Sequence, residues 1–96
     1  MIGVILDLSV KEERIDEFIS MMKQILPETR AYEGCHEFNI WIDQMNEGRV
    51  LLNEIWDSQE KHQAYLGWRE ETGVLQKLID MLNAPPEPMY FKILPS

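Results

Sequence analysis

Aromatic and polar side chains that could bind or convert a small molecule gather between residues 39 and 69. The set combines rings with amide, imidazole, guanidinium and carboxyl groups: Asn39, Trp41, Asn53, Glu54, Trp56, His62, Tyr65, Trp68 and Arg69. Asn is uncommon in strands, and a buried Trp or Tyr normally gives its N–H or O–H a partner. For any one of these residues, packing in a core or an interface is the stronger interpretation. For the whole set, a pocket for a planar ligand explains the pattern equally well.

Other kinds of chemistry lack the residues that they need. His36 and His62 lie far apart, without a Cys or carboxylate at metal-ligand spacing, so the sequence predicts no metal site. Cys35 and His36 are neighbours on a predicted strand and point to opposite faces, which favours Cys35 as a core residue over a nucleophile. The glycines form no phosphate-binding string. We therefore expect no metal, haem or flavin.

The composition narrows the class of protein and its partners. The chain has 96 residues, which predicts a single domain over 1–96. Nine Lys and Arg against 17 Asp and Glu give a net charge of −8, which disfavours nucleic acid and anionic membrane as partners. One cysteine, Cys35, cannot form an intramolecular disulfide, and no apolar run approaches the ~20 residues of a spanning helix. We expect a cytoplasmic protein with neither an export signal nor a membrane span.

The elements that must position the polar and aromatic set follow from the hydrophobic periodicity. Residues 2–8 are aliphatic apart from Asp7, which predicts a strand that is buried mostly on both faces. The stretch from Ser9 to Glu12 matches a capping box, so a helix should begin there. An apolar stripe at helical spacing follows, and Pro27 should end this helix because it has no N–H to continue it.

The second half predicts a hairpin, a helical region and a last strand. Residues 37–43 and 50–56 alternate between apolar and polar, and turn residues separate them, so we expect an antiparallel hairpin. Asp57 or Ser58 should cap a helix that Gly73 breaks or bends, and a helical stripe resumes after Gly73 until the prolines from Pro85. Residues 89–94 alternate again as a strand.

The order β-α-β-β-α-β predicts a ferredoxin-like α+β fold, with an antiparallel sheet and both helices on one face. Apolar or aromatic side chains nevertheless occur at both parities of the strands: Ile5, Trp41, Leu51, Ile55 and Tyr90. A lone two-layer domain would leave this second face in water. We therefore expect a homodimer that closes sheet on sheet, with a pocket possible in each half.

Four segments of this chain resemble the antibiotic biosynthesis monooxygenase (ABM) domain family, whose members are also described as quinol-monooxygenase-like. They are Glu33–Cys35, Leu52–Ser58, Tyr65–Gly73 and Pro85–Pro86. The resemblance covers essentially the whole chain through short motifs. It implies a dimeric α/β barrel and a cofactor-free oxygenase of electron-rich aromatics, such as quinols or polyketide phenols, with dioxygen as the second substrate. A deprotonated hydroquinone can itself give an electron to dioxygen, so the protein need only bind, orient and deprotonate it.

The resemblance also implies roles for individual residues. Trp56 matches the family's Trp at the end of the third strand, where it would line the pocket. Asn39 or Asn53 could hold a substrate oxygen. From the aromatic and polar set itself, we predict Trp41, Trp68 and Arg69 as further substrate contacts. Where many members carry a His on the following helix, this chain has Tyr65, with His62 one turn earlier. An unperturbed Tyr is a poor base at neutral pH, so either His62 deprotonates the substrate or the site is not catalytic.

We therefore predict that Trp56, Tyr65, Trp68 and Asn39 line one cavity between the sheet and the second helical region. His62, Tyr65 and Asn39 are the catalytic candidates, with His62 nearby as the base. The alternative for His62 is a position on the solvent face of its helix. The alternative function is a non-catalytic dimeric module that binds a small ligand. Sequence alone leaves both questions open.

Overall fold

Four antiparallel strands form one sheet in the order β2-β3-β1-β4 in the computed structural model, which describes residues 1–95. The strands are β1 (Ile2–Ser9), β2 (Cys35–Asp43), β3 (Asn46–Trp56) and β4 (Met89–Lys92). Their neighbours in the sheet all pair antiparallel. The predicted hairpin is thus confirmed as β2 and β3, and the longest strand, β3, lies in the middle of the sheet.

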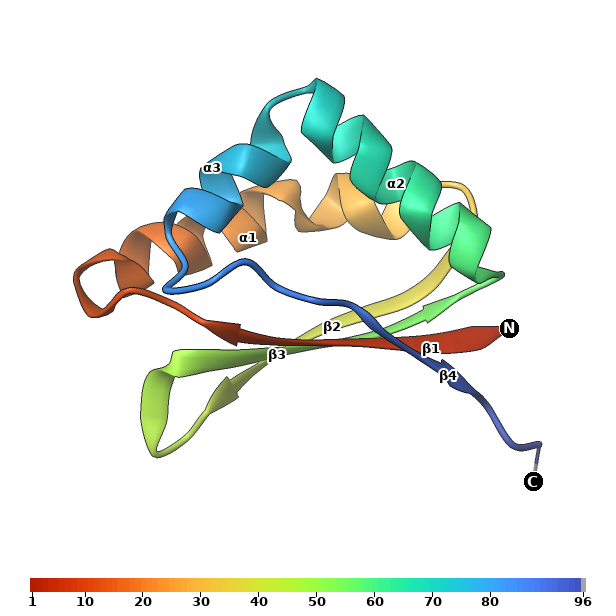
Figure 1. Cartoon of the computed structure of the whole chain (residues 1–96), viewed down its shortest axis with the longest axis horizontal. Helices are drawn as coiled ribbons and strands as arrows, with labels where there is room; N and C mark the ends of the chain where they lie inside the picture. Colours follow the sequence, from red (N-terminus) through yellow and green to blue (C-terminus); the bar gives the residue numbers. More distant parts are fainter. Residues whose placement is uncertain (96) are drawn as a thin grey trace.

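Three α-helices and one 3₁₀ turn cover a single face of this sheet (Figure 1). They are the 3₁₀ turn η1 (Glu12–Arg14) and the helices α1 (Ile15–Ala31), α2 (Gln59–Glu71) and α3 (Val74–Asp80). The order and the one-sided packing confirm the ferredoxin-like α+β fold. None of the helices in residues 1–95 is both long and apolar enough to cross a membrane.

The period-two pattern of β3 divides the sheet into an inner face, under the helices, and an outer face. Val50, Leu52, Glu54 and Trp56 are all buried on the inner face, and the residues between them are half-buried on the outer face. On β1, the alternate residues from Val4 to Leu8 join the same inner layer. One carboxyl residue, Glu54, therefore sits in an otherwise apolar row.

The start and end of α1 differ from the prediction. Ser9 belongs to β1 and its Oγ accepts a hydrogen bond from Asn83, so it does not cap a helix. Pro27 lies inside α1 rather than at its end. A proline within a helix costs about 3 kcal/mol. Here its ring is exposed, and the burial of Ile25 and Thr29 on either side of it offsets that cost.

The boundaries of α2 follow the predicted local chemistry. Ser58 is the N-cap, and its hydroxyl accepts a hydrogen bond from the backbone N–H of Lys61 at 3.2 Å. Gly73 has a φ of 82°, a left-handed conformation that glycine adopts without strain, and it separates α2 from α3. The short helix α3 then turns back over the sheet on the same side as α1 and α2 (Figure 1).

The outer face of β1 is more exposed than predicted, and the two edge strands carry exposed apolar side chains. Asp7 is exposed, so β1 is fully buried only on its inner side. Large apolar side chains on and next to the outer strands are about half exposed: Trp41 at 55%, Met89 at 43%, Phe91 at 47% and Ile93 at 45%. An apolar face of this kind usually marks a contact with another molecule.

Candidate active site

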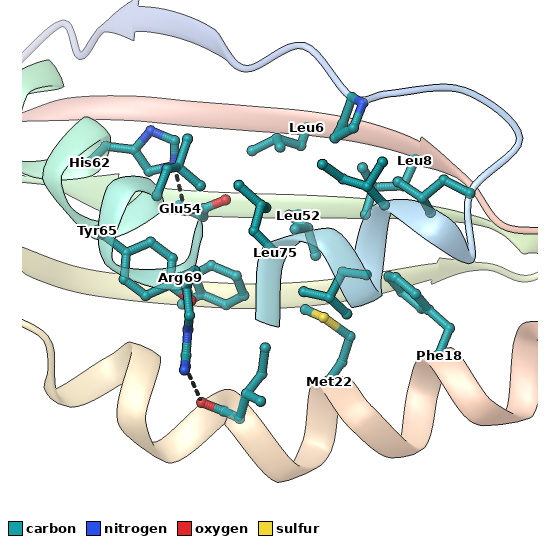
Figure 2. A pocket seen from close by; sticks show the side chains of 17 residues that line it. Leu6, Leu8, Phe18, Met22, Leu52, Glu54, His62, Tyr65, Arg69 and Leu75 are labelled. Carbon is teal, nitrogen blue, oxygen red and sulfur yellow. Dashed lines mark hydrogen bonds and ion pairs between the residues drawn. The ribbon is translucent and has the colours of Figure 1, made fainter. Parts of the chain in front are cut away.

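A cavity lies between the inner face of the sheet and the three helices. Its volume is about 60 Å³, several times the roughly 10–15 Å³ that one water requires. Figure 2 shows aliphatic and aromatic side chains, among them Leu6, Leu8, Phe18 and Met22, around most of it, and four polar residues at one end. These four are Glu54, His62, Tyr65 and Arg69. The cavity is therefore an apolar chamber with a polar end.

Glu54 brings a carboxyl group into this end from β3. Its exposed fraction is 1%, and its Oε1 accepts a hydrogen bond of 2.8 Å from the indole N–H of Trp56, two residues along the same face. Burial disfavours the ionised carboxylate and raises the pKa of Glu54 to about 7, while the Trp56 hydrogen bond acts in the opposite direction. A carboxyl group with this pKa exchanges protons readily at neutral pH.

His62 faces the same carboxyl group from the first turn of α2. Its Nε2 lies 3.6 Å from Glu54 Oε1, and its Nδ1 shares a hydrogen bond of 2.9 Å with the hydroxyl of Tyr90 on β4. Only 1% of its surface is exposed, so the alternative position on the solvent face is wrong. Burial lowers the pKa of His62 to about 4, and the ring is neutral at pH 7.

Tyr65 and Arg69 form a second polar cluster with Thr29 of α1. Arg69 Nε donates to the Tyr65 hydroxyl at 3.0 Å, and its terminal nitrogen donates to Thr29 Oγ1 at 3.1 Å and to the Ile25 carbonyl at 3.2 Å. The Tyr65 and Thr29 oxygens are 2.6 Å apart. Because Thr29 donates to the Ile25 carbonyl, the Tyr65 O–H is the donor to Thr29. Burial raises the pKa of Tyr65, so it stays protonated.

The predicted aromatic residues of α2 and β3 lie behind the cavity rather than on its wall. Trp56 packs against the rings of His62 and Tyr65, with centroids 5.3 and 5.2 Å away. Trp68 stacks on Tyr32 at 5.3 Å, and the Arg69 guanidinium lies 4.3 Å from the centre of its indole. Both Trp residues therefore hold the polar end in place, and neither lines the cavity.

Asn39, Trp41 and Asn53 do not join this site. Asn39 pairs with Asn53, and Trp41 pairs with Leu51, at positions that alternate with the inner-face pairs of β2 and β3. All of them thus point to the outer face, away from His62 and Tyr65. The prediction that Asn39 shares a cavity with Tyr65 is wrong. The reason is strand parity: an odd-numbered residue near this point of β2 cannot face the helices.

Glu54 is the residue of this site that the sequence-based choice of catalytic candidates omitted. A signal for it exists in the sequence, because Glu54 has the same parity as Val50, Leu52 and Trp56. A carboxyl residue in an apolar row of a strand must be buried, and a buried carboxyl has an altered pKa. Cys35, predicted as a core residue, is only partly buried and packs against the core, and burial raises the pKa of its thiol to about 11, which disfavours a nucleophile.

Comparison with known proteins identifies the family of this chain. The family model described as antibiotic biosynthesis monooxygenase matches residues 1–70. The chain belongs to this family. The match extends from β1 through most of α2, so it includes Glu54, His62, Tyr65 and Arg69 and ends before α3 and β4. Among residues 1–95 of this family member, no three His, Cys, Asp or Glu residues are grouped closely enough to hold a metal ion.

Solved structures share the fold at low sequence identity. A crystal structure of an antibiotic biosynthesis monooxygenase has a TM-score of 0.87 and 18% identity, and the match covers 99% of this chain and 100% of that one. A conserved protein from Methanosarcina mazei Go1 has a TM-score of 0.84 and 21% identity, over 95% and 90% of the two chains. At these identities the likeness shows the fold alone.

A sequence relative is longer than this chain. An uncharacterised protein of Synechocystis sp. (strain ATCC 27184 / PCC 6803 / Kazusa) is 23% identical over 91 residues. The match covers 91% of this chain and 59% of that protein, so the chain spans a little over half the length of this curated relative.

Proposed function

We propose that this protein oxidises a small electron-rich phenol or quinol with dioxygen, in the cavity between the sheet and the helices and without a cofactor. The observation that carries the proposal is the apolar chamber with a titratable polar end. An aromatic ring would pack against the apolar part, and a phenol hydroxyl group requires a proton acceptor at one place. Membership of the antibiotic biosynthesis monooxygenase family supports the same class of reaction.

The reaction balances without an external reductant. The site removes the hydroxyl proton, and the phenolate gives one electron to dioxygen. The resulting phenoxyl radical and superoxide combine in a C–O bond at the para carbon. The terminal peroxide oxygen takes up one proton, after which the para hydrogen leaves as a proton, the O–O bond breaks, and the departing hydroxide takes up a second proton to form water. The two protons taken up balance the two released from the phenol hydroxyl and the para carbon. A phenol and dioxygen thus give a quinone and water, and each product receives one of the two oxygen atoms of dioxygen.

The apolar wall has a physical role in this scheme. In a chamber without bulk water, a phenolate is not stabilised by hydration, so it gives an electron to dioxygen more easily. The same exclusion of water protects the reactive intermediates from hydrolysis. The aliphatic wall, with residues such as Leu6, Leu52 and Leu75, provides that environment. Tyr65 is held by Arg69 and Thr29, so we assign it the role of a fixed wall rather than an acid or base.

The direct test uses 2,6-dimethylphenol, which has one ring and a free para carbon, and isotopically labelled dioxygen. We expect formation of the dimethylbenzoquinone with one labelled oxygen atom, together with consumption of one dioxygen for each quinone. Absence of quinone with this phenol and with hydroquinone would contradict the proposal. Binding of these compounds without oxidation would instead support a non-catalytic ligand-binding module.

We further propose that two copies of the chain associate through their outer faces. The support is the half-exposed apolar side chains of the two edge strands, with Trp41 on β2 and Met89 and Phe91 on β4. Burial of such a surface contributes roughly 25 cal/mol per Å². Sedimentation at micromolar concentration should therefore show a dimer, and Trp41→Glu should shift it to the monomer. A monomeric wild type would contradict this proposal.

A further inference from the structure

We propose that Glu54 accepts the hydroxyl proton of the phenol and passes it through His62 to Tyr90 at the edge of the sheet. The inference rests on the proposed function and names the groups that start its reaction. The three side chains come from β3, α2 and β4, respectively. Glu54 and His62 line the cavity, and Tyr90 lies half-buried on the edge strand β4. Together they connect the cavity to the surface.

The carboxyl group of Glu54 has one oxygen free for a ligand. Within residues 1–95, its hydrogen bonds and ion pairs involve only Oε1, which faces Trp56 and His62. Figure 2 shows the other carboxyl oxygen directed toward Leu52 and Leu75 in the apolar part of the cavity. Glu54 is also the one carboxyl residue on the cavity wall in this part of the chain. A phenol hydroxyl at the polar end therefore meets this oxygen.

The other polar residues of the wall are poorly placed to take the proton. The Tyr65 hydroxyl already donates to Thr29 and accepts from Arg69. Arg69 has no acceptor atom. Both ring nitrogens of His62 face other protein groups, with Nδ1 toward Tyr90 and Nε2 toward Glu54. The geometry thus leaves Glu54 as the first acceptor and His62 as the next group along.

The charges around Glu54 favour this order. Its titratable neighbours come from β2, α2 and β4: Cys35, His62, Tyr65 and Tyr90. Burial keeps each of these four neutral at pH 7, because it lowers the pKa of the His and raises that of the Cys and both Tyr. Arg69 is the cation on the same wall, and its guanidinium is directed at α1. Glu54 therefore titrates among neutral groups, and its pKa of about 7 suits proton acceptance at neutral pH.

A proton on Glu54 needs a route out, because only 1% of this residue is exposed. His62 can take it at Nε2 and release the proton of Nδ1 to the Tyr90 oxygen, whose own O–H proton goes to water. The 3.6 Å between His62 Nε2 and Glu54 Oε1 is longer than a hydrogen bond, so the ring must move slightly for the transfer. The substrate loses one proton, the solvent gains one, and each protein group regains its proton count.

The first test uses para-nitrophenol, whose phenolate absorbs visible light, and needs no turnover. We expect the wild-type protein to bind it at pH 7 largely as the phenolate, with at least about tenfold less phenolate in Glu54→Gln. Glutamine keeps the size of the side chain and can still accept from Trp56. Glu47→Gln, on an exposed position of the same strand, is the matched control and should behave as wild type.

Several outcomes would overturn the assignment of Glu54. One is an equal amount of bound phenolate in the wild type and in Glu54→Gln. Another is bound phenolate that is lost in His62→Gln but retained in Glu54→Gln. A third is no binding of para-nitrophenol to the wild type. Titration calorimetry is the control that checks whether Glu54→Gln still binds para-nitrophenol. Should it fail to fold, Glu54→Asp, which withdraws the carboxyl group by one methylene, replaces it and should also reduce the phenolate.

The second test addresses the route. A pH-indicator dye in weakly buffered solution follows the proton after rapid mixing with para-nitrophenol. In Tyr90→Phe we expect phenolate formation at the wild-type rate but proton release slower by at least about tenfold. Tyr32→Phe removes a hydroxyl that is not on the proton route from Glu54 to Tyr90, and it should leave both rates unchanged. Equal release rates in Tyr90→Phe and wild type would overturn the route.

Failure of this inference and failure of the proposed function are distinguishable. Both para-nitrophenol tests report on proton transfer in the absence of oxidation. A protein that forms the phenolate through Glu54 but makes no quinone from 2,6-dimethylphenol would keep the inference and refute the oxygenase. If the Glu54→Gln variant makes the quinone as fast as the wild type does, the oxygenase proposal stands and the role of Glu54 is refuted.

Discussion

Two buried polar clusters meet at the same end of the cavity, and they differ in how completely their hydrogen bonds are satisfied. The Arg69 cluster joins a permanent cation to Tyr65, Thr29 and the Ile25 carbonyl through three hydrogen bonds of 3.0–3.2 Å, and Tyr65 and Thr29 are joined to each other at 2.6 Å. The Glu54 cluster has one hydrogen bond to Trp56 and a 3.6 Å approach to His62. The first cluster holds α2 against α1. The second leaves a carboxyl oxygen and a neutral imidazole available for chemistry.

The contrast shows how to separate structural from functional groups in a small core. A buried polar group with every donor and acceptor paired stabilises one arrangement. A buried carboxyl group with a pKa near 7 and an open oxygen does the opposite, because its ionisation at neutral pH weakens the fold. Such a cost is expected at a site that acts on a ligand. The predictions below test this division.

The largest expected effect is the loss of the structural cluster. Arg69→Met should lower the free energy of unfolding by about 3–5 kcal/mol, because three buried hydrogen bonds from a charged group are lost together. Arg49→Met is the control, since Arg49 pairs with Asp7 at an exposed position and should change stability by less than about 1 kcal/mol. Denaturant unfolding of both variants checks this. Equal losses would mean that the Arg69 cluster has no special structural role.

The Glu54 cluster should instead reveal itself in the pH dependence of stability. The pKa of Glu54 is about 7 in the folded protein against an ordinary 4.5, so the folded state binds more protons and stability falls as pH rises from 4.5 to 7. The pKa of His62 is about 4 against 6.5, so its contribution rises from pH 4 to 6.5. Each effect amounts to about 3 kcal/mol, and they oppose each other.

Substitution of either Glu54 or His62 should therefore reveal the pH dependence of stability that the other residue causes. Relative to wild type, Glu54→Gln should gain about 3 kcal/mol of unfolding free energy between pH 4.5 and 7, and His62→Gln should lose a similar amount over the same range. Denaturant titrations at several pH values measure both differences. Parallel pH profiles for wild type and Glu54→Gln would show that the Glu54 pKa is ordinary.

A smaller effect should come from the hydrogen bond that tunes Glu54. Trp56→Phe removes the N–H donor to Oε1 but keeps an aromatic ring, so the pKa of Glu54 should rise further above 7. The loss corresponds to about 1.5–3 kcal/mol for the charged form. NMR titration of the Glu54 carboxyl group detects the change. A lower pKa in this variant would contradict the account of the site.

The smallest effect is expected on the outer face. Asn39→Ala should leave the Glu54 titration unchanged and alter the free energy of unfolding of the monomer by no more than about 0.5 kcal/mol. Asn39 lies opposite Asn53 in the register of β2 and β3, on the face of the sheet away from the cavity. The same NMR titration, run beside thermal unfolding, provides the measurement. A shift of the Glu54 pKa in Asn39→Ala would require a link through the sheet.

Much of this fold could be predicted from local patterns. The alternation in residues 37–43 and 50–56, the cap at Ser58 and the break at Gly73 each depend on neighbouring residues, and the structure confirms them. The end of α1 could not be predicted in this way. Pro27 is tolerated inside the helix because tertiary burial of its neighbours outweighs a local cost, and tertiary burial is not visible in a local pattern.

The candidate site was only partly predictable for a similar reason. His62, Tyr65 and Arg69 share one face of α2, and sequence analysis places them together correctly. Asn39 and Asn53 were misplaced because residue type was weighed above strand parity. The reversal of roles between Glu54 and His62 depends on burial, which exchanges the ordinary order of their pKa values. Unperturbed pKa values alone favour His62 as the base.

The proposed chemistry depends on Glu54 as a buried carboxyl group that accepts a proton at neutral pH. The most direct measurement is an NMR titration of the Glu54 side-chain carboxyl carbon, assigned by its absence from the spectrum of Glu54→Gln. The account predicts a midpoint at about pH 7 in the free protein. A midpoint at the ordinary value of 4.5 would contradict it, because Glu54 would then be ionised throughout the neutral range at no cost to the fold.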